Sequence, residues 1–153
     1  MLLSTVIFSA LATIATATPV ESAAELQRRQ DTNGVIFLIN GERQKAGCQT
    51  LTPDSRLTSA AAREANDMAT NHFFSHQGSD GSGFTDRISA TGYIWKTAGE
   101  NIYLGGDAAA AFNAWMKSPE HKANILNCGY SQTGVAAANA AEGTYWVQEF
   151  ASF

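Results

Sequence analysis

Two strand-like segments near the C-terminus place the strongest constraint on how this chain can fold. Residues 133–139 and 144–150 both follow the two-residue period of a β-strand, and a turn at Glu142-Gly143 separates them. Apolar side chains occupy both faces of the second segment, with Tyr145 and Val147 on one face and Trp146 and Phe150 on the other. A sheet that is apolar on both faces must be covered on both sides. The pattern therefore predicts a sheet with helices packed against each face.

Residues typical of helix starts and helix ends occur through much of the chain before these two strands. Apolar residues at helical spacing predict a helix over 34–46, in which Asn40 is expected to hold a neighbouring loop through its side-chain amide. The sequence Thr52-Pro53-Asp54 predicts the start of a second helix, with Thr52 as its N-cap, that runs to about residue 71. Further helices are expected over 84–90, after Asp107 and after Ser118-Pro119. Between them, we expect a strand at 93–97, a turn at 98–99 and a buried edge strand at 101–104.

The N-terminal end carries signals for export. An apolar run ends in Ala15-Thr16-Ala17, so residues 1–17 are predicted to be a signal peptide. The run is too short, and too rich in Ser and Thr, to span a bilayer. Residues 18–29 end in Arg28-Arg29, which is either the end of a propeptide cut by a secretory-pathway endoprotease or a solvated charge pair. The mature chain is then a single domain, residues 30–153, and we expect it to be a secreted extracellular monomer.

Charge and cysteine content narrow the choice of partners and compartment. The 153-residue chain has a formal net charge of −4 and no basic run, which disfavours nucleic acid and anionic membranes as partners. Its two cysteines, Cys48 and Cys128, are expected to form one disulfide in an oxidising compartment; the alternative is two separate buried thiols. Closing that loop would stabilise the fold by up to about 4.5 kcal/mol on the chain-entropy model.

Histidines supply the first candidates for a functional cleft. His72 and His76 are four residues apart, but Phe73 stands where a zinc-protease helix needs its glutamate, so that activity is disfavoured and His72 is expected to end a helix. Ser118 is expected to cap a helix through its hydroxyl group rather than act as a nucleophile. His121 lies in the first turn of that helix, whose positive end favours a neutral ring. It is either a ligand or a hydrogen-bonded structural histidine.

An ordered set of motifs resembles the CAP superfamily, named for cysteine-rich secretory, antigen 5 and pathogenesis-related 1 proteins. The set covers residues 35–151, nearly the whole predicted mature chain. Its blocks are Asn40-Gly-Glu-Arg43-x-x-x-Gly47, Phe74-Ser-His76, Gly99-Glu100-Asn101-Ile102, Trp115-x-x-Ser118-x-x-His121 and Tyr145-Trp146-Val147-Gln148. With only two cysteines, the chain is similar to the short single-domain members, with their SCP-like extracellular domain.

The resemblance implies an α+β fold, a three-layer α-β-α sandwich around a small, mainly antiparallel sheet. It also implies a cleft of two His and two Glu that holds zinc or magnesium in some members. His76, Glu100 and His121 match that pattern, whereas Ser118 stands where the second glutamate is expected. We therefore expect a three-ligand metal site with an open water position, and no cofactor that the protein requires.

Three functions are open on these grounds. The leading hypothesis is a secreted, non-enzymatic protein that binds a sterol or fatty acid and a divalent metal, with a role in host defence or virulence, as the resemblance implies. The second is a metal-assisted protease or esterase in which Glu100 is the general base. The third is a non-catalytic signalling protein that is recognised through its surface, in which Glu100 only organises the fold.

Overall fold

The computed structural model describes residues 22–153. The elements in chain order are α1 (Ala23–Lys45), β1 (Thr52–Pro53), α2 (Ser55–Asn71), α3 (Phe84–Ala90), β2 (Thr97–Gly105), α4 (Ala108–Lys117), α5 (Pro119–Ile125), β3 (Gln132–Ala140) and β4 (Gly143–Ser152). The predicted signal peptide lies outside the described residues. No helix within residues 22–153 is long and apolar enough to cross a membrane.

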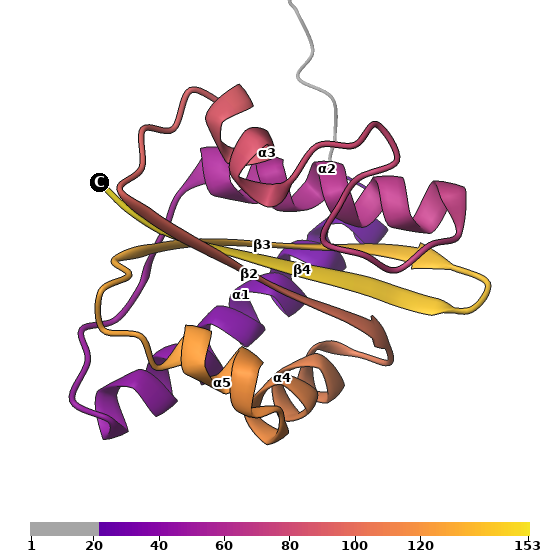
Figure 1. Ribbon diagram of the computed structural model, residues 1–153. Helices are drawn as coiled ribbons and strands as arrows, with labels where there is room; N and C mark the ends of the chain where they lie inside the picture. Colours follow the sequence, from indigo (N-terminus) through magenta and orange to yellow (C-terminus); the bar gives the residue numbers. More distant parts are fainter. Residues whose placement is uncertain (1–21) are drawn as a thin grey trace, which may run out of the picture.

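The strands form one sheet in the order β1-β3-β4-β2, with helices on both faces (Figure 1). β4 pairs antiparallel with β2 and β3, and only the two-residue β1 pairs parallel with β3. Helices α2 and α3 cover one face, while α1, α4 and α5 cover the other. The three-layer α+β sandwich with a mainly antiparallel sheet is therefore confirmed.

Each face of the sheet has its own apolar core. Val35, Ile39, Trp115, Trp146 and Phe150 pack together on the side of α1, α4 and α5. The alanine-rich face of α2 packs against the opposite side, so closely that a Cβ atom on Gly134 would lie 2.1 Å from the backbone nitrogen of Thr58. Only glycine allows this approach, which brings the first turn of α2 directly onto β3.

The start of α2 differs from the prediction. Asp54, not Thr52, is the N-cap, and its side chain accepts a hydrogen bond from the backbone N–H of Arg56. Thr52 and Pro53 instead form β1, because the backbone N–H groups of Thr52 and Asp54 donate to the carbonyl oxygens of Ser131 and Thr133. The predicted end of the helix is confirmed, since His72 is its C-cap with a φ of 54°.

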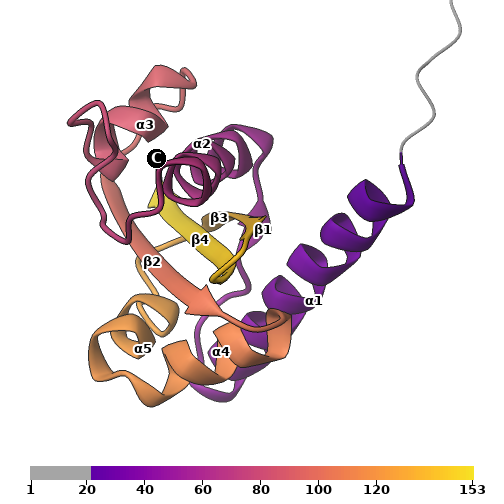
Figure 2. The same ribbon diagram turned by 90° about the vertical axis from the view of Figure 1, so that its right-hand side faces the viewer.

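Helix α1 starts eleven residues before the predicted position of residue 34, at Ala23, after a Ser22 N-cap. Its first half is mostly polar, so it shows no helical spacing of apolar residues from which a helix could be predicted. This half projects away from the rest of the molecule (Figure 2). Arg28 and Arg29 lie inside the helix, so cleavage at the predicted dibasic site would require this turn to unwind.

The second half of α1 is tied to the loops around α5. The buried guanidinium group of Arg43 donates to the carbonyl oxygens of Gln49, Ile125, Asn127 and Tyr130 at 2.8–2.9 Å. Asn40 holds Leu51 through both atoms of its amide, as predicted. The Cys48–Cys128 disulfide, also predicted, lies beside these bonds and joins residues 80 positions apart. Arginine, amide and disulfide together fix α1 to the end of the sheet.

Candidate functional site

The cleft is organised by a hydrogen-bonded chain of three residues from three elements. Nδ1 of His76, in the loop after α2, lies 2.6 Å from Oε1 of Glu100 on β2. Oε2 of Glu100 in turn accepts a hydrogen bond of 2.7 Å from Nη2 of Arg87 on α3. The Glu100 side chain is fully buried, whereas that of His76 is 53% exposed. The buried Glu100 thus fixes the Nδ1 side of the His76 ring, while the rest of the ring lies at the surface.

Two further buried carboxyl groups lie behind this chain. Glu64 on α2 places Oε2 2.9 Å from Nη1 of Arg87, and Glu149 on β4 stands directly across from Glu100 in the strand pairing. Burial raises the pKa of Glu64 to about 7. Burial, followed by the negative charge of Glu100, raises the pKa of Glu149 well above its ordinary value. One guanidinium therefore pairs with two of these carboxyl groups, and the third, on Glu149, holds its proton more tightly than an exposed glutamate does.

The oxygens of Glu64 and Glu149 have no hydrogen-bond partner within residues 22–153. Nη1 of Arg87 is close enough to Glu64 for an ion pair, but it directs its hydrogen bond to the carbonyl oxygen of Ser82. A buried group without a partner costs free energy. The cluster is therefore a region where fold stability depends on protonation.

The second histidine of the cleft lies on α5. His121 is the third residue of that helix, and its carbonyl oxygen accepts a hydrogen bond of 3.2 Å from Nδ2 of Asn101 on β2. Nδ2 of Asn124 donates to Oδ1 of Asn101 at 2.9 Å, which fixes α5 against the strand next to Glu100. These amides hold the backbone of α5 at His121 against the strand that carries Glu100.

The two histidines have opposite titration behaviour. The hydrogen bond to Glu100 raises the pKa of His76, whereas burial, together with the nearby positive charge of His76, lowers the pKa of His121. The predicted neutral state of His121 agrees with this direction. Protonation is thus favoured at His76 and disfavoured at His121.

Ser118 is the N-cap of α5, as predicted, but its side chain makes no capping hydrogen bond. That part of the prediction is wrong, because Pro119 occupies the first helical position and the backbone carbonyl of Ser118, not its hydroxyl group, bonds to the helix.

The side chain of Glu100 has no unoccupied oxygen to offer a metal ion. No three His, Cys, Asp or Glu side chains within residues 22–153 are grouped so that they could hold one ion. Both oxygens of Glu100 are already engaged, by His76 and by Arg87. His76 uses Nδ1 for that bond, so Nε2 is its available donor, as in metal sites where a carboxylate orients a histidine. Glu100 as a direct ligand stays a prediction.

Arg87, Glu64 and Glu149 were missed as parts of the site. A signal for the two glutamates was present, since Glu64 stands on the apolar stripe of its helix and Glu149 alternates with Val147 on an apolar strand face. A charged residue at an apolar position of a periodic pattern indicates a buried charge with a partner. Nothing in the local sequence identified Arg87 as that partner.

Two surface grooves lie away from this cleft. The first, here called the α1–α2 groove, has a volume of about 370 Å³ and is lined by residues of α1, α2 and β3, including Arg28, Ala62, Asn66 and Ala137. The second, the α1–β1 groove, has a volume of about 410 Å³ and is lined by Ile36, Phe37, Gly41 and Pro53 among others. Neither includes His76, Glu100 or His121.

Comparison with known proteins agrees with this geometry. The model of a family described as CAP, the cysteine-rich secretory protein family, matches residues 36–150. Protein YkwD of Bacillus subtilis (strain 168) is 36% identical over 117 residues, which cover 76% of this chain and 45% of YkwD. The chain thus spans less than half the length of this curated relative.

Solved structures share the fold at lower identity. An extracellular protein of Bacillus anthracis that contains an SCP domain superposes with a TM-score of 0.77 at 24% identity, over 90% of this chain and 45% of its own. An outer surface protein of Borrelia burgdorferi superposes with a TM-score of 0.74 at 22% identity, over 81% of this chain and 93% of its own. At these identities the likeness establishes the three-layer architecture alone.

Proposed function

Because this chain belongs to the cysteine-rich secretory protein (CAP) family, we propose that it is a secreted, non-enzymatic binding module whose cleft takes up a divalent transition metal through His76 and His121. The observation that carries this proposal is the 2.6 Å contact between His76 Nδ1 and Glu100 Oε1, which orients the ring and leaves Nε2 as the donor. Secretion is supported by the predicted signal peptide and by the extracellular or surface location of the two structural relatives.

Each residue of the cleft described above has a defined part in this binding. Arg87 holds Glu100, Glu100 holds His76 in one ring orientation, and Asn101 positions the backbone of His121. Two imidazoles suit zinc, copper or nickel better than magnesium, which prefers oxygen ligands. When bound, such an ion supplies a positive charge and open positions for water or an anionic ligand. Since the ligands must be deprotonated, binding would strengthen as pH rises through the raised pKa of His76.

Zinc titration followed by calorimetry tests the proposal. His76→Ala and His121→Ala should abolish stoichiometric binding, and Glu100→Gln should weaken it by about tenfold because ring orientation is lost. His72→Ala is the matched control, since His72 is an exposed histidine at the end of α2 that bonds Glu142 instead of the cleft. Equal zinc binding in the wild type and in both cleft variants would refute the metal site.

A second candidate is an apolar ligand, such as a fatty acid or sterol, in the α1–β1 groove. Phe37 lines this groove and is 79% exposed, and Ile36 and Pro53 add further apolar surface. An exposed aromatic side chain next to a groove is typical of a binding surface. Fluorescence of cis-parinaric acid should rise on binding to the wild type and fall by most of that rise in Phe37→Ser. Ile94→Ser, which removes another exposed apolar side chain outside the groove, should bind like the wild type; equal fluorescence in all three proteins would exclude this groove.

The buried position of Glu100 weighs against the hydrolase hypothesis. A general base needs an oxygen that faces the substrate or its water, and both oxygens of this side chain are occupied. The third hypothesis, in which Glu100 organises the fold, draws support from the same contacts, because they join the loop at His76, β2 and α3. A surface-recognised signalling role is compatible with metal binding.

A further inference from the structure

The outer edge of β3 is open over most of its length. β1 pairs only with Gln132 and Thr133, because the chain leaves the sheet at Asp54 to begin α2. Within residues 22–153, the remaining residues of β3, from Gly134 to Ala140, have β4 on one side and no strand on the other. An unpaired strand edge exposes backbone donors and acceptors, and natural proteins usually cover it.

The hydrogen bonds to the β1 segment show in which direction these backbone groups point. The carbonyl oxygen of Thr133 accepts a hydrogen bond from the N–H of Asp54 in the β1 segment, so Thr133 and every second residue of β3 after it direct their backbone groups away from β4. Strand geometry extends this alternation to Val135, Ala137 and Asn139. Within residues 22–153, no hydrogen bond reaches the outer N–H or C=O groups of Val135 and Ala137.

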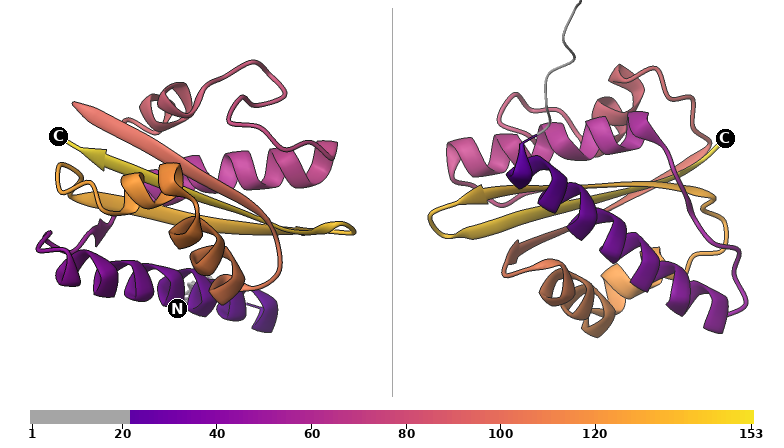
Figure 3. Two further views of the ribbon diagram at one scale, coloured as in Figure 1. Left: turned by 60° about the horizontal axis from the view of Figure 1, so that its bottom comes forward. Right: turned by 180° about the vertical axis from the view of Figure 1, so that it is seen from behind.

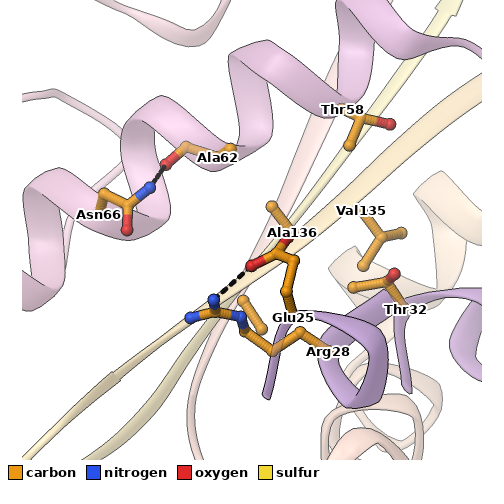
Figure 4. Close-up of a pocket in the computed structure, with 9 residues that line it drawn as sticks. Glu25, Arg28, Thr32, Thr58, Ala62, Asn66, Val135 and Ala136 are labelled. Carbon is orange, nitrogen blue, oxygen red and sulfur yellow. Dashed lines mark hydrogen bonds and ion pairs between the residues drawn. The ribbon is translucent and has the colours of Figure 1, made fainter. Parts of the chain in front are cut away.

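Helices α1 and α2 both extend beyond this edge of β3. The edge therefore lies at the bottom of a slot between the two helices. Figure 3 shows α1 and α2 on opposite faces of the sheet, with β3 between them. Their side chains line the α1–α2 groove together with Val135, Ala136 and Ala137 (Figure 4). The walls are formed mainly by small or uncharged residues, such as Ala62 and Thr58, and the paired charges of Glu25 and Arg28 lie among them, in the middle of the view. The slot is open where a further strand of the sheet would lie.

We propose that this slot binds an extended segment of a partner polypeptide, which joins the sheet as a further strand beside β3. The alternating N–H and C=O groups of Val135, Ala137 and Asn139 match a peptide backbone and no smaller ligand. The alanine walls favour a segment with small side chains. Glu25 and Arg28 carry opposite charges, so the slot does not select a positively or a negatively charged partner. The affinity is therefore set by hydrogen bonds between the two backbones.

The same geometry disfavours a second copy of this chain as the occupant. Two β3 edges would have to meet, but each edge is recessed between its own α1 and α2. The overhanging helices of the two molecules would collide before the backbones reached the ∼4.8 Å strand spacing. A single extended segment has no such helices and can enter.

Amide hydrogen exchange of the isotope-labelled full chain tests the proposal. The probe is a blocked nine-residue peptide of alternating threonine and valine with a lysine at each end. Its control is the same peptide N-methylated at two adjacent central residues, which removes one donor from each edge. At millimolar peptide, exchange at Val135 and Ala137 should slow by at least about tenfold, and the methylated twin should have no effect.

Two substitutions on α2 make the test specific for the slot. Ala62→Phe fills the groove and should abolish the protection, whereas Ser59→Phe adds the same side chain at an exposed position of the same helix outside the groove and should leave it unchanged. Thermal unfolding of both variants shows whether each is folded. If Ala62→Phe does not fold, Ala137→Pro replaces it, because proline removes an outward N–H at a position that an edge strand tolerates.

Three results would overturn the proposal. The first is unchanged exchange at both amides in the presence of the unmethylated peptide. The second is slow exchange in the free protein that is lost when residues 1–21 are removed, which would make the chain's own N-terminal segment the occupant. The third is protection that grows with protein concentration alone, which would make a second copy the occupant.

Discussion

Arg87 is the residue on which the cleft depends most. Its guanidinium group is buried and faces Glu64 and Glu100, while Glu149 approaches Glu100 from the neighbouring strand. Like charges directly opposite in a sheet repel, so the pair is stable only when one of the two carboxyl groups is protonated. The buried cluster therefore couples the stability of the fold to pH.

We predict that the free energy of unfolding falls as pH rises from 5 to 8. The carboxyl group of Glu64 has a pKa raised from 4.5 to about 7 in the folded state, so its contribution to stability is greatest below pH 4.5 and is lost as pH passes about 7. The raised pKa values of Glu149 and His76 act in the same direction. Denaturant unfolding at several pH values should show a fall of about 1–3 kcal/mol.

Substitution of Glu149 measures its share of this pH dependence. Glu149→Gln is neutral at every pH and should reduce the slope of the curve between pH 5 and 8, leaving the part that Glu64 and His76 contribute. Glu142→Gln is the control, because hydrogen bonds from Tyr145 and His72 lower the pKa of Glu142 to about 2, and its contribution is lost only in acid. An unchanged slope in Glu149→Gln would show that the proton is not held where we place it.

At the scale of elements, α1 is anchored by a few polar contacts in its second half. Arg43 and Asn40 bond to the backbone of loops that lie far from α1 in sequence. These side-chain hydrogen bonds satisfy backbone groups of the loops that have no partner in a helix or a strand. Residues in the first half of the helix, Glu25, Arg28 and Thr32, form part of the wall of the α1–α2 groove.

Arg43→Met should destabilise the fold by about 3 kcal/mol or more. The substitution keeps most of the apolar volume but leaves the buried carbonyl oxygens of Ile125 and Tyr130 without a donor. Lys45→Met on the same helix is the control, since Lys45 is exposed and makes only an i,i+3 ion pair with Glu42. Chemical denaturation measures both variants, and similar losses in the two would contradict an anchoring role for Arg43.

Capping and turn residues in the sequence predicted an element correctly where contacts between residues close in sequence determine its structure. The Asp107 cap, the helix over 84–90 and the hairpin at Glu142-Gly143 are all confirmed. Thr52-Pro53 was misread because a strand pairing with β3, distant in sequence, outweighs its capping preference. The expected strand at 93–97 and turn at 98–99 are also wrong, since β2 begins only at Thr97 and includes both turn residues. There the pairing with β4 sets the conformation.

The candidate site divides in the same way. Family motifs brought out His76 and Glu100, and the structure places them in contact. The burial of Glu100 and its bond to Arg87 depend on the packing of α3 against β2, which no spacing in the sequence encodes. For that reason the sequence suggested a carboxylate ligand, whereas the geometry favours a carboxylate that orients a histidine.

At the scale of the whole molecule, the Cys48–Cys128 bond turns the chain into a closed ring with two tails. The ring holds α2 to α5 with β1 and β2, one tail is α1, and the other is the β3–β4 hairpin. Cutting one peptide bond in the ring releases no fragment, because the disulfide still joins both ends. Cutting one bond at Arg28-Arg29 in the first tail does release one. The predicted dibasic site thus lies where a single hydrolysis is enough to change the composition of the molecule and to remove Glu25 and Arg28 from the wall of the slot beside β3.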